Sequence, residues 1–344
     1  MKYSNHNNLS NMRHPKVYSK YLHYFKHYTN TGKIGNILLN RYEAGTKRVK
    51  MSSRPYKITI DPGNFCNLRC PGCHTGIKHP EMIDPGFLKL GDFKSIFAQL
   101  EPYAISVALY NWGEPFLNKQ IFDMIAHSTE RGVGTTLHSN FNVFNEAMAE
   151  NAVKSGLTHI YMSIDGSTQE AYSKYRVRGN LEHVMDNLKL LLETRKRLNS
   201  KFPIITWKFL EFEHNAHERE EARHRADVLG VDAFEAFVGR PKLTDIYDEA
   251  EAYKANGAKS NKKETCPSLW SSIYVNADGS VLPCSLAYRE NEVFGNLLQN
   301  TLDEIWNNDK YIESRKIFKG TAEPDKVPLP CKACKYYLMC NAKK

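Results

Sequence analysis

Long apolar runs are missing from this chain of 344 residues, and none approaches the roughly 18 residues that a transmembrane helix needs. The N-terminus also has no apolar stretch of the kind found in secretory signal peptides. We therefore expect a cytoplasmic protein that does not bind a membrane. Hydrophobic residues make up 41% of the sequence, enough for a sizeable core, and the length suggests about two or three domains.

Acidic residues are scarce in the first 54 positions, where Glu43 stands alone against eleven lysines and arginines. This segment therefore carries a net charge of +10, while the whole chain carries +9. Such a segment is suited to nucleic acid, an anionic surface or an acidic peptide. It contains no nucleic-acid-binding motif, so we interpret residues 1–54 as a basic N-terminal extension laid over the next domain and expect no nucleic-acid partner.

Cysteine is absent between residues 73 and 266, so the eight cysteines fall into separate groups. Disulfides are rare in the reducing cytoplasm, and metal binding therefore explains these cysteines better. One tight group lies in the first quarter of the chain, a pair follows the gap, and three more lie near the C-terminus. The groups are Cys66, Cys70 and Cys73; Cys266 and Cys284; and Cys331, Cys334 and Cys340.

Short β-rich runs alternate with longer amphipathic stretches from about residue 56 to 238, the pattern of a parallel sheet with crossover helices. Six such units predict an α/β fold: an open, partial (β/α)6 barrel of the TIM type, with ligands at the C-terminal ends of its strands. We expect strands at 56–61, 105–110, 133–138, 159–164, 204–209 and 233–238, and helices at 118–131, 146–155, 180–199 and 217–229.

A small α+β domain is expected at residues 266–344, after the 55–240 core and a polar connector at 241–265. In this domain Asp278-Gly279 separates two β-rich runs, which is a strong hairpin signal. Residues 301–318 read as one helix.

Cys66, Cys70 and Cys73 directly follow the first expected strand, so one loop presents three thiolates. Three ligands leave one iron of a [4Fe–4S] cluster open, whereas structural zinc sites usually close with four. The spacing resembles the signature of the radical SAM superfamily, except that Gly72 stands where an aromatic residue is frequent. The alternative is a zinc knuckle that recruits His74 or His79.

The resemblance implies that S-adenosylmethionine binds the open iron and is cleaved to a 5′-deoxyadenosyl radical, which abstracts a hydrogen atom from the substrate. Asn111-Trp-Gly-Glu-Pro115 looks like the superfamily's Gly-Gly-Glu segment, with Trp112 in place of the first glycine. Polar strand ends would hold the ribose, and Arg178, preferred to Arg176, would hold the carboxylate. His214-Asn215 is either an adenine contact or a helix cap. The implied cofactor-binding residues are Glu114, Ser139, Asn140, Ser163, Asp165 and Arg178.

Cys266, Cys284, Cys331 and Cys334 supply four thiolates, the number that closes a second cluster. Residues 276–284, 294–296 and 302–306 resemble the SPASM domain of radical SAM enzymes in its shortened, one-cluster "twitch" form, so the resemblance covers residues 55–340. It implies an auxiliary [4Fe–4S] cluster. Cys340 either replaces one of the four or is a free thiol, and the alternative for the whole set is a zinc ribbon.

The resemblance implies a radical SAM oxidoreductase. Shortened domains with this spacing resemble those of aminocyclitol dehydrogenases, so we expect oxidation of a sugar- or aminocyclitol-like alcohol, with the auxiliary cluster assisting. An extension of about 50 residues is short for a separate peptide-binding domain, which favours a small substrate. The alternative is a peptide-modifying enzyme that crosslinks, epimerises or oxidises a ribosomal peptide. An alternative of another class is a non-catalytic zinc protein whose basic arm contacts nucleic acid.

The expected partners are a small-molecule or peptide substrate and a reductase or flavodoxin-type electron donor. The sequence assigns no catalytic residue. Four candidate general bases lie near expected strand ends: His138, Glu211, His214 and Arg240.

Overall fold

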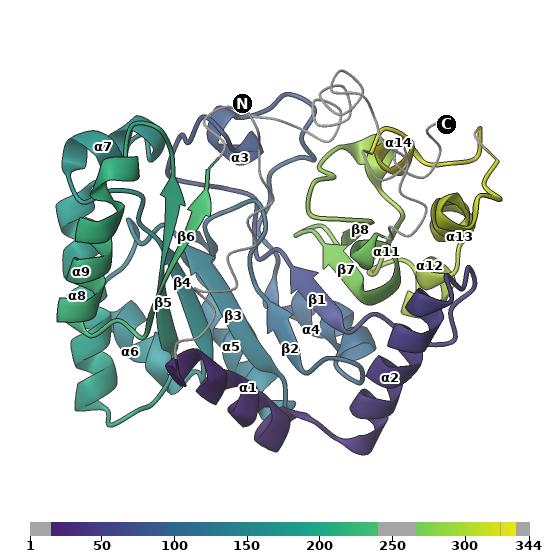
Figure 1. The fold of residues 1–344 in the computed structure, drawn as a ribbon. Coiled ribbons are helices and arrows are strands. Elements are labelled where there is room, and N and C mark those ends of the chain that lie inside the picture. Colours follow the sequence, from purple (N-terminus) through teal and green to yellow (C-terminus); the bar gives the residue numbers. More distant parts are fainter. Residues whose placement is uncertain (1–14, 240–265, 324, 335–344) are drawn as a thin grey trace.

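The structure is a computed structural model that describes residues 15–239, 266–323 and 325–334 (Figure 1). Two residues named above, Arg240 and Cys340, lie outside these ranges. None of the helices in the described ranges is long and apolar enough to cross a membrane.

The described residues form one nine-stranded sheet in the order β6-β5-β4-β3-β2-β1-β7-β8-β9. Strands β1 to β6 run parallel, β7 runs parallel to β1, and β8 and β9 are antiparallel to their neighbours. The expected α/β fold with a partial barrel is therefore confirmed. The strands are β1 (Lys57–Ile60), β2 (Ser106–Ala108), β3 (Gly134–Ser139), β4 (His159–Ser163), β5 (Ile204–Glu211), β6 (Ala233–Val238), β7 (Ser272–Val275), β8 (Ser280–Leu282) and β9 (Gly295–Asn296).

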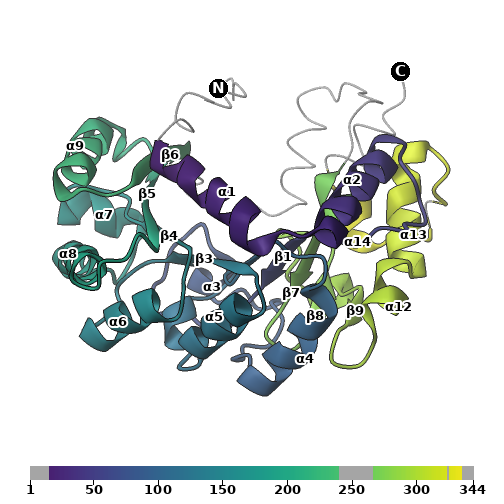
Figure 2. The ribbon, with the colours of Figure 1, turned by 90° about the horizontal axis from the view of Figure 1, so that it is seen from below.

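One face of the sheet is apolar and packs against helices, because side chains alternate between the two faces of a strand. Leu137 of β3, Ile160 of β4 and Ile205 of β5 lie side by side on this face and are fully buried. Figure 2 shows helices along this side of the sheet. The crossover helices are α4 (Leu90–Leu100), α5 (Ile121–Glu130), α6 (Glu146–Lys154), α7 (Gln169–Tyr175), α8 (Leu181–Arg197) and α9 (Arg219–Leu229), with short helices α3 (His74–Ile77), η2 (Pro115–Leu117) and η3 (Ala216–Glu218) in the loops.

The N-terminal extension forms two helices, α1 (Pro15–Tyr28) and α2 (Thr31–Gly45), where the sequence had not led us to expect any. Helix α1 lies across the concave face of the sheet (Figure 2), and the Tyr24 hydroxyl lies 3.4 Å from the Thr136 hydroxyl. A side chain at Gly134 would collide with the Tyr24 ring. Helix α1 is thus built into the concave side of the core, while Asn40 of α2 donates to Trp270 O of α11 (Pro267–Ser271) at 2.6 Å.

The C-terminal domain begins with α11 (Pro267–Ser271) and the expected hairpin, in which Gly279 adopts a φ of 83° between β7 and β8. The single helix predicted at 301–318 is wrong, because the chain breaks it. Asn308 caps a new helix by accepting from Tyr311 N, and Asn307 accepts from Met51 N at 2.8 Å. The pieces are α12 (Leu302–Trp306), α13 (Asp309–Lys316) and η5 (Ile317–Lys319), flanked by η4 (Glu290–Glu292) and α14 (Leu329–Lys332).

Candidate functional site

The loop after β1 gathers three thiols at the C-terminal edge of the barrel. The Cys73 backbone N–H donates to Cys70 O at 3.2 Å. Burial, with smaller contributions from the charges of Glu114, Cys73 and Cys70, raises the pKa of the Cys66 thiol to about 12, so the three thiols lie within electrostatic reach of one another. Gly76 packs so closely on the Cys70 backbone that a side chain there would collide with it.

Asp61 ties this loop to the segment after β2. Its buried carboxylate accepts from Trp112 N at 2.9 Å and from Gly63 N at 3.3 Å, and burial raises its pKa to about 7. Gly113 touches Gly63 so closely that a side chain would strike its carbonyl oxygen. Asp61 is not among the site residues expected from the sequence, although an acid directly after a barrel strand was the available signal. The two loops are therefore held as one unit.

Glu114 is the buried acceptor of this unit, with 3% of its surface exposed. Its carboxylate accepts from the Ser139 hydroxyl at 2.7 Å, from Asn140 N at 2.8 Å and from Phe116 N at 3.2 Å. Burial raises the pKa of Glu114 to about 7 despite these donors. The Asn140 side chain lies 3.7 Å from Cys66 Sγ. Three predicted cofactor-binding residues thus meet beside the cysteine loop.

Asp165 is buried at the end of β4, and both of its oxygens are already bonded. One accepts from Leu210 N at 2.7 Å and the other from Arg176 Nε at 2.6 Å. Burial opposes the charge on Arg176, but Asp165 and Cys70 outweigh it and hold the pKa of Arg176 above its ordinary value. Its guanidinium reaches Cys70 Sγ at 3.8 Å. The structure brings Arg176 to the cysteine loop, whereas Arg178 is exposed with a φ of 74°.

The concave face near these residues is polar and aromatic. His138 of β3 stacks on Tyr110 with ring centroids 3.8 Å apart and lies 4.3 Å from the Tyr161 ring. Further along the strands, Ser163 of β4 lies beside Lys208 of β5. Burial and the charge of Arg176 lower the pKa of Lys208. This face is the surface on which a substrate would meet the cysteine loop.

The remaining candidates lie at the end of β5 and on the loop that follows it. Glu211 pairs with Arg219 at 3.0 Å. The His214 ring stacks on Phe212, whose ring packs on Tyr175 in the apolar cluster that includes Cys70. Asn215 is buried and bonds Phe212 N, Asp165 O and Leu210 O. Asn215 therefore holds the turn, while His214 packs on Phe212, a member of the apolar cluster that contains Cys70.

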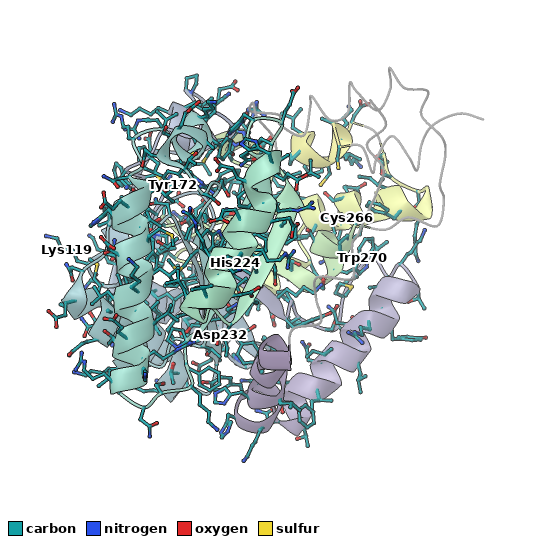
Figure 3. The ribbon with its side chains drawn as sticks, turned by 60° about the vertical axis from the view of Figure 1, so that its left-hand side comes forward. Lys119, Tyr172, His224, Asp232, Cys266 and Trp270 are labelled. Atoms are coloured by element: carbon teal, nitrogen blue, oxygen red, sulfur yellow. The ribbon has the colours of Figure 1, made fainter. Side chains whose placement is uncertain are left out.

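The C-terminal cysteines form a second set. Burial raises the pKa of Cys284 to about 12, with added contributions from the charges of Cys266 and Cys334. Burial and the charges of Cys266, Cys284 and Cys334 likewise raise the pKa of Cys331. In Figure 3, Cys266 and Trp270 lie close together at the start of this domain. Four thiols thus lie within electrostatic reach of one another.

Both thiol sets fit iron–sulfur clusters by donor chemistry and burial. Within residues 15–239, 266–323 and 325–334, no three His, Cys, Asp or Glu side chains are arranged to hold a single metal ion. A multi-iron cluster spreads its thiolate ligands over several irons, whereas zinc draws its ligands to about 2.3 Å from one ion. His74 and His79, the extra zinc ligands considered above, pack their rings on Tyr288 at 3.8 and 5.0 Å.

The segment after Cys73 contacts the loop after Cys284. Besides the rings on Tyr288, Ile83 N donates to Tyr288 O at 2.9 Å, and Arg289 pairs with Glu81 at 2.8 Å. The two cysteine sets therefore belong to loops that pack on each other.

Comparison with known proteins gives two family matches: the radical SAM superfamily at residues 60–208 and the iron–sulfur cluster-binding SPASM domain at residues 266–335. The chain is 23% identical over 309 residues to a PqqA peptide cyclase of Xanthomonas euvesicatoria pv. vesicatoria (strain 85-10), covering 81% of this chain and 80% of that protein.

Two solved structures share the fold. Streptococcus suis SuiB bound to precursor peptide SuiA matches with a TM-score of 0.60 and 14% identity, covering 81% of this chain and 70% of that one. BtrN in complex with AdoMet and 2-DOIA matches with a TM-score of 0.50 and 16% identity, covering 83% of this chain and 94% of that one.

Proposed function

Because this chain belongs to the radical SAM superfamily and carries a C-terminal SPASM domain, we propose that it is an enzyme that crosslinks, epimerises or oxidises a peptide. The observation that carries this proposal is the match to PqqA peptide cyclases over four fifths of both chains. The alcohol dehydrogenase that we expected from the sequence has weaker support, since BtrN is similar only in fold.

The cofactors of the chain are S-adenosylmethionine and [4Fe–4S] clusters. When bound, they supply a radical that removes a hydrogen atom from the substrate. In our proposal, Cys66, Cys70 and Cys73 hold the first cluster. Cys266, Cys284, Cys331 and Cys334 hold the auxiliary cluster, and this set is complete without Cys340.

Glu114 is proposed to accept the ammonium group of S-adenosylmethionine. A cation beside this buried carboxylate favours its charged form, which burial alone disfavours. Arg176 is proposed to pair with the cofactor's carboxylate, with Asp165 fixing the guanidinium through its Nε. Ser139 and Asn140 hold Glu114 in place, and the Asn140 side chain lies beside Cys66. Each group has a buried partner, so the site is organised before the cofactor arrives.

The peptide residue to be modified is proposed to lie on the concave face, against His138, Tyr161 and Lys208. Helix α1 packs against this face at Gly134 and Thr136, near the start of β3. The substrate therefore approaches from the C-terminal ends of the strands, where the cysteine loop lies.

The test uses the reconstituted protein with S-adenosylmethionine and dithionite in place of the proposed reductase or flavodoxin-type donor. Short peptides encoded beside the gene and a panel of polyols and aminocyclitols are offered, and products are read by mass spectrometry. We expect a mass change in a peptide that requires Cys70, with the Cys70→Ala variant as control. If an alcohol is oxidised and every peptide stays unchanged, the peptide proposal is wrong and the dehydrogenase hypothesis holds.

A further inference from the structure

Tyr311 lies on α13 in the core of the C-terminal domain and is fully buried. Its ring packs edge-on against Phe294 with centroids 4.9 Å apart, and it lies 4.8 Å from the ring of Trp306. The Arg315 guanidinium lies 5.0 Å from the ring centre. These contacts fix the ring and, with it, the direction in which the hydroxyl points.

The Tyr311 hydroxyl has no hydrogen-bond partner among the residues that the structure describes, and it is shielded from solvent. A buried hydroxyl without a partner costs folding free energy, and a bound water, ion or cofactor is a common reason for one in a native protein. The hydroxyl is thus a donor available to a group that is not part of the polypeptide.

Cysteine thiols lie near this hydroxyl. Burial raises the pKa of Tyr311, and the charges of Cys331 and Cys284 raise it further, so both thiols lie within its electrostatic reach. Ser314, three residues along α13 and on the same face, hydrogen-bonds the Cys331 thiol. Figure 1 shows α13 in the same part of the molecule as α14, which carries Cys331. Helix α13 therefore turns its 311–314 face toward the cysteine set.

We propose that Tyr311 donates a hydrogen bond to a sulfur of the cluster held by Cys266, Cys284, Cys331 and Cys334. Hydrogen bonds to cluster sulfurs stabilise the added negative charge of the reduced form and so raise the reduction potential. Tyr311 thereby sets how readily the auxiliary cluster accepts an electron. This inference rests on the proposed cysteine assignment and is independent of the peptide substrate.

The experiment compares Tyr311→Phe with wild type in anaerobic redox titrations of the full-length reconstituted protein, followed by EPR. Signals are assigned with a Cys66/Cys70/Cys73→Ala variant, which retains only the auxiliary cluster. We expect Tyr311→Phe to keep its iron and to shift the auxiliary potential downward. Because the hydroxyl has no partner among the described residues, its removal breaks no described contact.

Tyr274 supplies the matched control, since the charges of Cys284 and Cys266 also act on it, but its hydroxyl bonds Ser268 and Ser272. Tyr274→Phe should leave the potential unchanged. An unchanged potential in Tyr311→Phe, or equal shifts in both variants, would overturn the proposal.

If Tyr311→Phe fails to fold, 3-fluorotyrosine at position 311 keeps the ring and is a stronger donor. An upward shift then supports the proposal and no shift overturns it. Loss of all iron in the triple alanine variant would instead refute the cysteine assignment.

Discussion

The backbone N–H of Asn140 donates to the Glu114 carboxylate at 2.8 Å, which joins the end of β3 to the segment after β2. The side chain of the same asparagine lies 3.7 Å from Cys66 Sγ. Glu114 therefore lies where the loops after β1, β2 and β3 meet. A substitution that removes its charge but keeps its size tests the proposed cofactor site without reshaping it.

Glu114→Gln should weaken S-adenosylmethionine binding about 10- to 100-fold, because a hydrogen bond to a charged group contributes about 1.5–3 kcal/mol. Iron content should stay at the wild-type value. Equilibrium dialysis of the reconstituted protein measures the dissociation constant. Glu211→Gln is the control, since Glu211 at the end of β5 pairs with Arg219 of α9. If wild type and Glu114→Gln bind S-adenosylmethionine with equal affinity, Glu114 does not contact the cofactor.

Binding of S-adenosylmethionine should depend on pH through Glu114, whose pKa is raised by burial to about 7 before an ammonium group binds. The ionised carboxylate is the form that accepts the ammonium. Affinity should therefore fall about tenfold for each pH unit below 7 and level off above it. The same dialysis between about pH 5.5 and 7.5, where the cofactor's amino group stays protonated, follows this, and Glu114→Gln should give a flat profile over that range. A wild-type profile that is also flat contradicts the assignment.

Arg176 and Arg178 should differ sharply when each is replaced by glutamine. Arg176 is paired with buried Asp165 and reaches Cys70, so Arg176→Gln should reduce 5′-deoxyadenosine formation at least tenfold. Arg178 is exposed, and Arg178→Gln should stay within about twofold of wild type. The measurement is deoxyadenosine release under dithionite. The reverse order of effects would return the role to Arg178.

Gly113→Ala should destabilise the fold by about 1–3 kcal/mol, because the new methyl group has no room beside the Gly63 carbonyl. Gly86→Ala is the matched control, since a methyl group there meets open space. Urea unfolding of both variants measures the difference. If both substitutions lower the free energy of unfolding equally, the close contact between Gly113 and Gly63 does not explain the glycine at position 113.

Cys334→Ser should lower the iron content from about eight to about four per chain, since four thiols are needed to close the auxiliary cluster. Cys340→Ser should leave it unchanged. Iron and sulfide analysis after anaerobic reconstitution distinguishes them. If Cys340→Ser loses iron and Cys334→Ser keeps all of it, then Cys340 and not Cys334 is the fourth ligand.

The six barrel strands, the β7–β8 hairpin and the three-cysteine loop could be predicted from the sequence because their signals are local. Alternation of side chains fixes a strand within a few residues, and Asp278-Gly279 fixes a turn by itself. The spacing of Cys66, Cys70 and Cys73 identified the superfamily, and the family match confirms it. The SPASM resemblance rested on short segments of the same kind and is likewise confirmed.

Tertiary contacts decided the rest. The break at Asn307 depends on Met51, which lies 256 residues earlier in the chain. The position of Arg176 depends on Asp165 and Cys70, and no local pattern separates it from Arg178. Composition showed that residues 1–54 are basic, but not that α1 crosses the concave face. Sequence patterns specify the backbone conformation of short segments, whereas the direction of a single side chain is set by the buried charges and donors that folding brings around it.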